Sequence, residues 1–214
     1  MRGSGGQVRT VIAGVTVGGG GEVWRRFGFG VVDDAIRLDG VVLDVTSGRP
    51  LGLTLAGESD GEPGVTDLDG LPLSWGDPAP PGDRHDNGAV GLDHVVVTTP
   101  SLDRTTAALD ALGLEVRRER AAGAIRQRFL RLGAVILEMV GPADEPDPVP
   151  GVGEQPATIW GLAFTAPDLA TVVGHAAAAG LPMGDPRPAV QPGRHIVSVK
   201  REAGLPLPVA FMTP

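Results

Sequence analysis

The sequence predicts an α+β protein that is built from tandem βαβββ modules and carries a shortened copy of the module at its start. Two observations support this prediction. Acidic segments rich in proline and glycine, near 56–90 and 141–155, divide the chain into three bodies, and each body reads as a strand, a short helix and further strands. The bodies also resemble one another in sequence, which indicates a repeated structural unit.

Composition excludes several classes of protein. The 214 residues include no Cys and no Tyr, which excludes a disulfide scaffold, thiolate metal sites and a cysteine nucleophile. Few aromatic residues and a net charge of −8 argue against a nucleic-acid partner. No apolar run is long enough to span a membrane, and the first seven residues do not read as a signal peptide. We therefore expect a cytoplasmic globular protein.

The middle body shows the module most clearly. Residues 91–98, GLDHVVVT, are rich in β-branched side chains and predict a strand. Pro100 ends that strand, Ser101 is a suitable helix N-cap, and Gly113 stands where a glycine ends a helix. Three more strands are predicted at 114–120, 125–132 and 134–140.

The third body repeats this plan. A strand is predicted at 159–165, a helix opens at Asp168 and closes at Gly180, and later strands follow at 194–200 and 208–213. Residues 94–100 align without a gap on 161–167. The tandem repeat is therefore expected to form one domain over 90–214, with modules at 90–141 and 158–213.

The first body is a shortened copy. A strand is predicted at 11–17, and a helix of barely two turns follows at 22–27. Residues 37–45 align without a gap on 131–139. We expect a degenerate module over 1–57 and an acidic Pro/Gly-rich linker over 58–89.

A tandem βαβββ unit with His94 on its first strand and Glu138 on its last resembles the vicinal oxygen chelate superfamily. That group includes glyoxalases, bleomycin-resistance-type proteins, fosfomycin-resistance enzymes and extradiol dioxygenases. The residues that carry the resemblance are GLDHVVV at 91–97 and VILEMV at 135–140. The resemblance implies that two modules pair, so that their mixed sheets curl into one cup. A metal, where present, would be bound in the cup by first-strand and last-strand residues of both modules.

Strand geometry supports this placement. Side chains alternate between the two faces of a strand, so His94 shares a face with Val96 and Thr98, and Glu138 shares one with Ile136 and Val140. The other face of each strand is wholly apolar and suits packing against a helix. His94 and Glu138 should then line the cup. Imidazole and carboxylate are suitable ligands for Fe, Mn, Ni, Co or Zn.

The other bodies depart from the pattern. The third body has Gly161 and Phe211 at the positions of His94 and Glu138, and the first body has Gly14 and Asp44. One cup would therefore hold two protein ligands, whereas a catalytic metal site usually supplies about three. A divalent metal is expected to be absent or weakly held.

Three interpretations remain open, and the first is favoured. The metal site has degenerated, and the cup binds or turns over a small organic molecule, with His94 and Glu138 acting as a general base and its orienting partner. Gly161 and Ala163 would leave room on the opposite wall, and Phe211 would offer an apolar surface. The expected ligand-binding residues are Thr98, Gly161, Ala163, His195 and Phe211.

In the second interpretation the protein is a metal-dependent lyase, isomerase or dioxygenase. His195, Asp44 or the His94 and Glu138 of a second chain would complete the ligand set. In the third interpretation, His94 and Glu138 are a satisfied buried pair in a structural or interaction module without a ligand.

Three further expectations concern single features. His85 lies in the acidic linker and is interpreted as part of a solvated loop. Trp160 is expected to point to the face opposite Gly161 and to belong to the core. Three modules would leave one unpaired with an exposed apolar sheet face, so a homodimer is expected.

Overall fold

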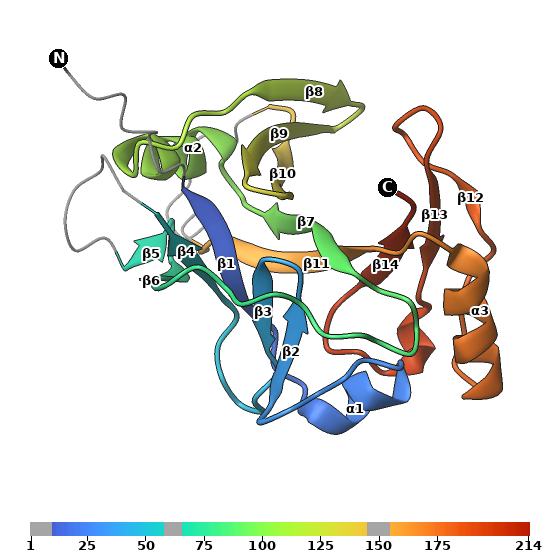
Figure 1. The fold of residues 1–214 in the computed structure, drawn as a ribbon. Helices are drawn as coiled ribbons and strands as arrows, with labels where there is room; N and C mark the ends of the chain where they lie inside the picture. Colours follow the sequence, from blue (N-terminus) through green and yellow to red (C-terminus); the bar gives the residue numbers. More distant parts are fainter. Residues whose placement is uncertain (1–9, 58–65, 145–154) are drawn as a thin grey trace, which may run out of the picture.

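Two mixed sheets lie against each other in the computed structural model, which describes residues 10–57, 66–144 and 155–214. Within these residues the smaller sheet has six strands in the order β2-β3-β1-β4-β6-β5. The larger has eight in the order β12-β13-β14-β11-β7-β10-β9-β8 (Figure 1). The predicted α+β class with mixed sheets is confirmed. None of the helices in the described residues has the length and apolar character needed to span a membrane.

The middle body forms one half of the large sheet as predicted, except that the strand expected at 114–120 lies at Arg118–Ala122. The Ser101 hydroxyl accepts a hydrogen bond from the Arg104 backbone N–H and caps the helix. Gly113 ends the helix with a φ of 70°, a conformation that favours glycine. The elements are β7 (Gly91–Thr98), α2 (Leu102–Ala111), β8 (Arg118–Ala122), β9 (Ile125–Leu132) and β10 (Val135–Pro142).

The third body forms the other half. Asp168 caps its helix by accepting a hydrogen bond from the Ala170 backbone N–H. The two halves meet where β7 and β11 pair antiparallel, so the predicted pairing of βαβββ modules is confirmed. The elements are β11 (Thr158–Thr165), α3 (Leu169–Ala178), β12 (Arg187–Pro188), β13 (His195–Ser198), a short 3-10 helix (Arg201–Ala203) and β14 (Val209–Met212).

Strand register shows the first body to be a copy of the module. Val42 pairs with Gly14 as Ile136 pairs with His94, which matches the alignment of 37–45 on 131–139. The elements are β1 (Val11–Thr16), α1 (Gly21–Arg26), β2 (Ala35–Leu38) and β3 (Val41–Asp44).

Three further strands complete the small sheet. The strand β4 (Gly52–Ala56) pairs antiparallel with β1 and parallel with β6 (Leu71–Trp75), and β5 (Asp67–Leu68) pairs antiparallel with β6. These relations repeat those of β11, β14 and β13 in the large sheet. The small sheet is thus a reduced copy of the large one. Two of its strands lie within 58–89, the range expected to be a linker.

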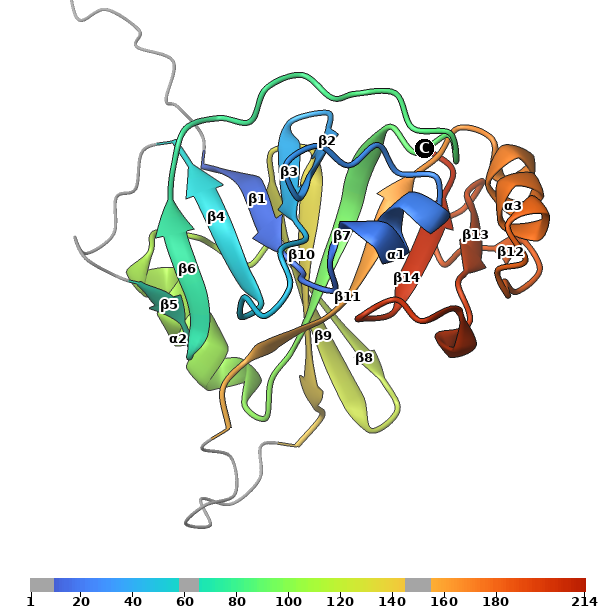
Figure 2. The ribbon, with the colours of Figure 1, turned by 90° about the horizontal axis from the view of Figure 1, so that it is seen from below.

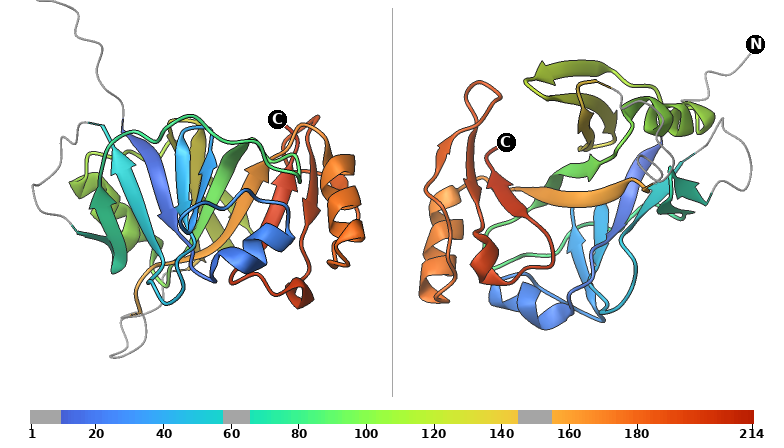
Figure 3. Two further views of the ribbon diagram at one scale, coloured as in Figure 1. Left: turned by 60° about the horizontal axis from the view of Figure 1, so that its bottom comes forward. Right: turned by 180° about the vertical axis from the view of Figure 1, so that it is seen from behind.

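The apolar face of the small sheet is not exposed, which corrects the expectation of an unpaired module. Buried residues of both sheets belong to one core cluster. At its centre, the ring of Phe29 lies 4.9 Å from that of Phe164 and 6.1 Å from that of Phe211. Figure 3 shows the strands of the small sheet lying across β7 and β11. The apolar face that suggested a homodimer is therefore covered within the chain, and the homodimer stays a prediction without that support.

The connection from β6 to β7 runs along the edge of the small sheet (Figure 2) and buries its histidine. His85 is 8% exposed. Its Nδ1 accepts a hydrogen bond of 3.0 Å from the Gly30 backbone N–H, and its Nε2 lies 3.2 Å from the Arg37 carbonyl oxygen. The interpretation of His85 as part of a solvated loop is wrong, because the ring packs against Phe29 and satisfies backbone groups of the first body.

Candidate functional site

One face of the large sheet carries both predicted site residues. We call it the inner face; the opposite face packs against the small sheet. Figure 1 shows the sheet curling, so that the β8–β9 hairpin rises on one side of β7 and β11, and β13 rises on the other. Pairing registers place the inner-face side chains in rows across the strands. The row through His94 is Arg131, Ile136, His94, Ala163, Ala210 and Ser198.

The neighbouring row passes through Glu138. In order it holds Arg118, Phe129, Glu138, Val96 and Gly161. A third row holds Arg120, Gln127, Val140, Thr98 and Thr158. The structure thus brings His94, Glu138, Thr98 and Ala163 onto one face of adjacent strands, as predicted from their alternation.

A β-bulge in β7 brings a second carboxylate to His94. Leu92 pairs with Phe164 and His94 pairs with Ala163, so Asp93 is an extra residue between two successive pairs. Bulges of this kind redirect a side chain. Asp93 is thereby turned toward the His94 ring, and its Oδ1 contacts His94 Nδ1. This contact is close, but it is not directed as a hydrogen bond.

Arg194 holds Asp93 from the second module. Its guanidinium forms an ion pair with Asp93 and donates from Nε to the Thr213 carbonyl oxygen at 2.6 Å. Burial raises the pKa of Asp93, but the contacts with His94 and Arg194 outweigh it and lower that pKa to about 2. Asp93 is therefore ionised at neutral pH, and Arg194, Asp93 and His94 form one continuous polar chain.

Sequence analysis missed both Asp93 and Arg194. Simple alternation assigns Asp93 to the face opposite His94, and nothing in the sequence links Arg194 to a strand about a hundred residues earlier. The one available signal was an aspartate next to a histidine inside an apolar strand.

Glu138 is half-buried and carries its own partner. Gln127 Nε2 donates a hydrogen bond of 2.6 Å to Glu138 Oε1. Burial raises the pKa of Glu138, and this effect outweighs the opposing influence of His94, Gln127 and Arg120. The carboxyl group is thereby brought closer to the range in which it exchanges protons near neutral pH.

The described residues of one chain supply two of the candidate metal ligands on the inner face, His94 and Glu138. Within the residues that the structure describes, no three His, Asp or Glu side chains are grouped so that they could hold a metal. Asp44, a candidate third ligand, is on the small sheet, where it pairs with Arg49 and accepts a hydrogen bond from the Thr46 backbone N–H. His94 and Glu138 thus remain two ligands, where about three are usual.

The predicted placement of Phe211 in the cup is wrong. Phe211 pairs with Phe164, is fully buried and packs against Phe29 in the core between the sheets. Ala210 occupies the position equivalent to Glu138, because it pairs with Ala163 as Glu138 pairs with Val96. The prediction failed by one residue because β14 is apolar on both faces, so its sequence does not specify which face is inner.

The predicted roles of Gly161 and Trp160 also change. A Cβ at Gly161 would lie 2.8 Å from the Pro208 carbonyl oxygen, so the glycine admits a close backbone contact, which is a structural reason for its presence. Trp160 is the extra residue of a second bulge, between Ile159 and Gly161. Its side chain is 53% exposed and is not part of the core, contrary to expectation.

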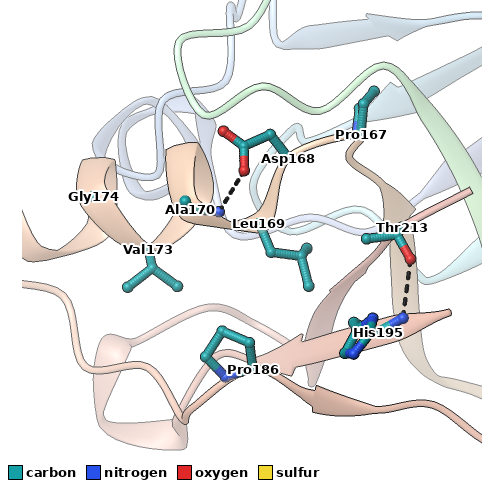
Figure 4. Close-up of a pocket in the computed structure, with 9 residues that line it drawn as sticks. All are labelled: Pro167, Asp168, Leu169, Ala170, Val173, Gly174, Pro186, His195 and Thr213. Atoms are coloured by element: carbon teal, nitrogen blue, oxygen red, sulfur yellow. Dashed lines mark hydrogen bonds between the residues drawn. The ribbon is translucent and has the colours of Figure 1, made fainter.

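His195 does not lie on the inner face, which corrects its predicted role. It shares the side of β13 that carries Val197, whose partner is the core residue Phe211. Figure 4 shows His195 beside α3, in a pocket of about 590 Å³. The other residues that line it are Pro167, Asp168, Leu169, Ala170, Val173, Gly174, Pro186 and Thr213.

Comparison with known proteins finds similarity at the level of the fold. No protein-family model and no curated protein matches the sequence. Among solved structures, methylmalonyl-CoA epimerase from Mycobacterium tuberculosis is 20% identical with a TM-score of 0.47, covering 59% of this chain and 89% of that one. Methylmalonyl-CoA epimerase from Streptomyces coelicolor, in complex with 2-nitronate-propionyl-CoA, is 20% identical with a TM-score of 0.43. The match covers 57% of this chain and 95% of that one.

A hypothetical protein from Bacillus halodurans C-125 is 17% identical with a TM-score of 0.45, covering 57% of this chain and 93% of that one. By its own strand order and registers, the eight-stranded sheet has the paired βαβββ arrangement that the resemblance to the vicinal oxygen chelate superfamily implied.

Proposed function

We propose that this protein binds a small organic molecule on the inner face beside His94 and Glu138, and that these two side chains exchange protons with it without a metal. The observation that carries the proposal is the polar chain of Arg194, Asp93 and His94, which ends next to a carboxyl group of raised pKa. A carboxyl group whose pKa is shifted by burial and by a specific charged neighbour is typical of acid–base sites.

Each residue of the chain has a distinct role. Asp93 faces His94 Nδ1, so Nε2 is the ring nitrogen that would meet a ligand. An ionised carboxylate beside Nδ1 stabilises, by its charge, the imidazolium that forms when Nε2 takes a proton. The carboxylate that assists His94 is therefore Asp93, whereas Glu138 would act as the second proton-exchanging group.

The surrounding side chains suit a small organic molecule. Val96, Val140 and Thr98 continue the inner face beyond Glu138, and Ala163 lies directly beside His94. Apolar side chains that surround a few convergent polar groups are typical of small-molecule sites. The metal-dependent alternative lacks this kind of support, because the described residues do not supply a third ligand.

A fragment screen that follows the backbone amide signals by NMR tests the proposal. We expect saturable shifts in β7 and β10, and binding weakened at least about fivefold, near 1 kcal/mol, by His94→Ala and by Glu138→Gln. His195→Ala is the matched control, because it removes a histidine from the other side of the sheet, and it should leave binding unchanged. Fragments that shift only α3, or none that bind, would contradict the proposal.

Proton transfer has a separate readout. A bound ligand with an acidic C–H bond should exchange that hydrogen with D2O faster in the presence of the wild-type protein than with His94→Ala. Asp93→Asn should lower the rate while binding is retained, because it removes the charge that stabilises the imidazolium. Equal exchange rates for all three proteins would leave binding as the whole function.

A further inference from the structure

We infer that the ligand of this site is an organic anion, and that Arg118, Arg120 and Arg131 bind its negative charge. This inference rests on the proposed function and names the class of ligand. It follows from the way β8 and β9 divide their charged side chains between the two faces of the sheet.

On the outer side of β8 and β9, Arg128 forms ion pairs with two carboxylates. Glu119 lies opposite Arg128 and accepts a hydrogen bond of 2.7 Å from its Nε. Arg128 also donates from Nη2 to Asp103 on α2 at 2.7 Å. The carboxylates of this region thus neutralise a guanidinium on the helix side.

On the inner side the arginines lack such partners. Arg118 lies opposite Phe129, Arg120 opposite Gln127, and Arg131 opposite Ile136. Within the described residues, none of these three arginines forms an ion pair with a carboxylate. Arg131 donates one hydrogen bond, from Nη1 to the Ala134 carbonyl oxygen at 3.3 Å.

The only acidic side chain in the three inner-face rows is Glu138. Arg120 favours its ionised form, but burial still raises its pKa. Three positive charges therefore share one wall with a single carboxyl group, in a protein whose net charge is −8. The carboxylate of Asp93, beside His94, is paired with Arg194. A wall of one sign attracts ligands of the opposite sign, and guanidinium groups bind carboxylates and phosphates in two-point contacts.

The curl of the sheet places this wall over the site. Figure 1 shows the β8–β9 hairpin rising above β7 and β11, and the registers put Arg118 and Arg120 on the inner face of that hairpin. Phe129 stands between Arg118 and Glu138 in the same row. On the other side of His94 the row continues through Ala163, Ala210 and Ser198, which are small and uncharged. The charge of the ligand would lie on the first module and its carbon skeleton across the second.

Hexanoate and its neutral isostere hexanamide test this inference by NMR titration of the full chain at neutral pH. We expect hexanoate to shift β7, β9 and β10 amides saturably and to bind about tenfold more tightly than hexanamide, a difference of about 1.4 kcal/mol. Raising the ionic strength should weaken hexanoate binding alone, because salt screens exposed charges.

A double variant tests whether Arg118 and Arg120 bind the negative charge of the ligand. Arg118→Gln/Arg120→Gln should weaken hexanoate binding about tenfold and remove the preference over hexanamide. The control, Arg117→Gln/Arg201→Gln, removes the same net charge from two exposed arginines outside the inner-face rows and should preserve the preference. Equal binding of the two probes in β7 and β10 would overturn the anion inference and leave the proposed function intact. If neither probe binds, the anion inference also fails, and the fragment screen decides the proposed function separately.

Discussion

The two modules of the large sheet have the same backbone plan but different chemistry. Each has a first strand with a bulge, at Asp93 in one and at Trp160 in the other, and each pairs its first and last strands in parallel. The first module carries His94 and Glu138, whereas the second has Gly161 and Ala210 at the equivalent positions. Duplication of the fold has thus kept the geometry in both halves and the acid–base groups in one.

The second module is also sterically closed to the missing histidine. A side chain at Gly161 would meet the Pro208 carbonyl oxygen, so a simple substitution there cannot restore a symmetric site. Its strands instead supply the core, through Phe164 and Phe211, and the guanidinium of Arg194 that holds Asp93. One half of the sheet therefore carries the two candidate acid–base residues, and the other half supplies the arginine that pairs with Asp93.

The largest expected effect distinguishes core from site within β14. Phe211→Ala should lower the free energy of unfolding by about 3–5 kcal/mol, because it leaves a cavity between the two sheets. Ala210→Ser, one residue away on the inner face, should change it by less than about 0.5 kcal/mol. Urea unfolding of both variants measures the difference. A cost below about 1 kcal/mol for Phe211→Ala would mean that the phenylalanine does not belong to the core.

A substitution at the close contact of the second bulge should lower the free energy of unfolding by a smaller amount. Gly161→Ala should destabilise the protein by about 1–3 kcal/mol, because its Cβ would press on the Pro208 carbonyl oxygen. Gly91→Ala is the matched control on β7, since a Cβ there would lie 4.0 Å from Thr165, an ordinary contact. Equal free energies of unfolding for the two variants would show that Gly161 is not constrained by the neighbouring strand.

The smallest expected effect is a pH dependence that belongs to the first bulge alone. The pKa of Asp93 is about 2 in the folded protein and near 3.9 when unfolded. Its contribution is therefore fully present above about pH 4 and is lost as pH falls toward about 2. With solvent screening allowed for, the contribution is about 1 kcal/mol.

Acid-dependent urea unfolding measures that contribution. Asp93→Asn should flatten the decline in stability below about pH 4, whereas Trp160→Phe, at the equivalent bulge, should leave the decline unchanged. An undiminished decline in Asp93→Asn would show that the carboxylate is not stabilised by His94 and Arg194 in the folded state.

The sequence predicted the features that depend on local periodicity. Alternation placed His94 and Glu138 on one face, and the gapless alignments identified three copies of the module. The features it missed depend on register and long-range pairing. The bulge at Asp93 breaks the alternation, and the apolar strand β14 left Phe211 and Ala210 interchangeable. The two short strands β5 and β6 lie in a Pro/Gly-rich acidic segment whose composition resembles a linker and are held by pairing with β4.

The central claim is that the site works through its own side chains and not through a resident metal ion, and metal analysis tests it most directly. Protein purified without chelators should contain far less than one Fe, Mn, Ni, Co or Zn ion per chain, and fragment binding in β7 and β10 should be the same before and after dialysis against EDTA. One equivalent of such a metal, lost in His94→Ala and retained in His195→Ala, would contradict the account.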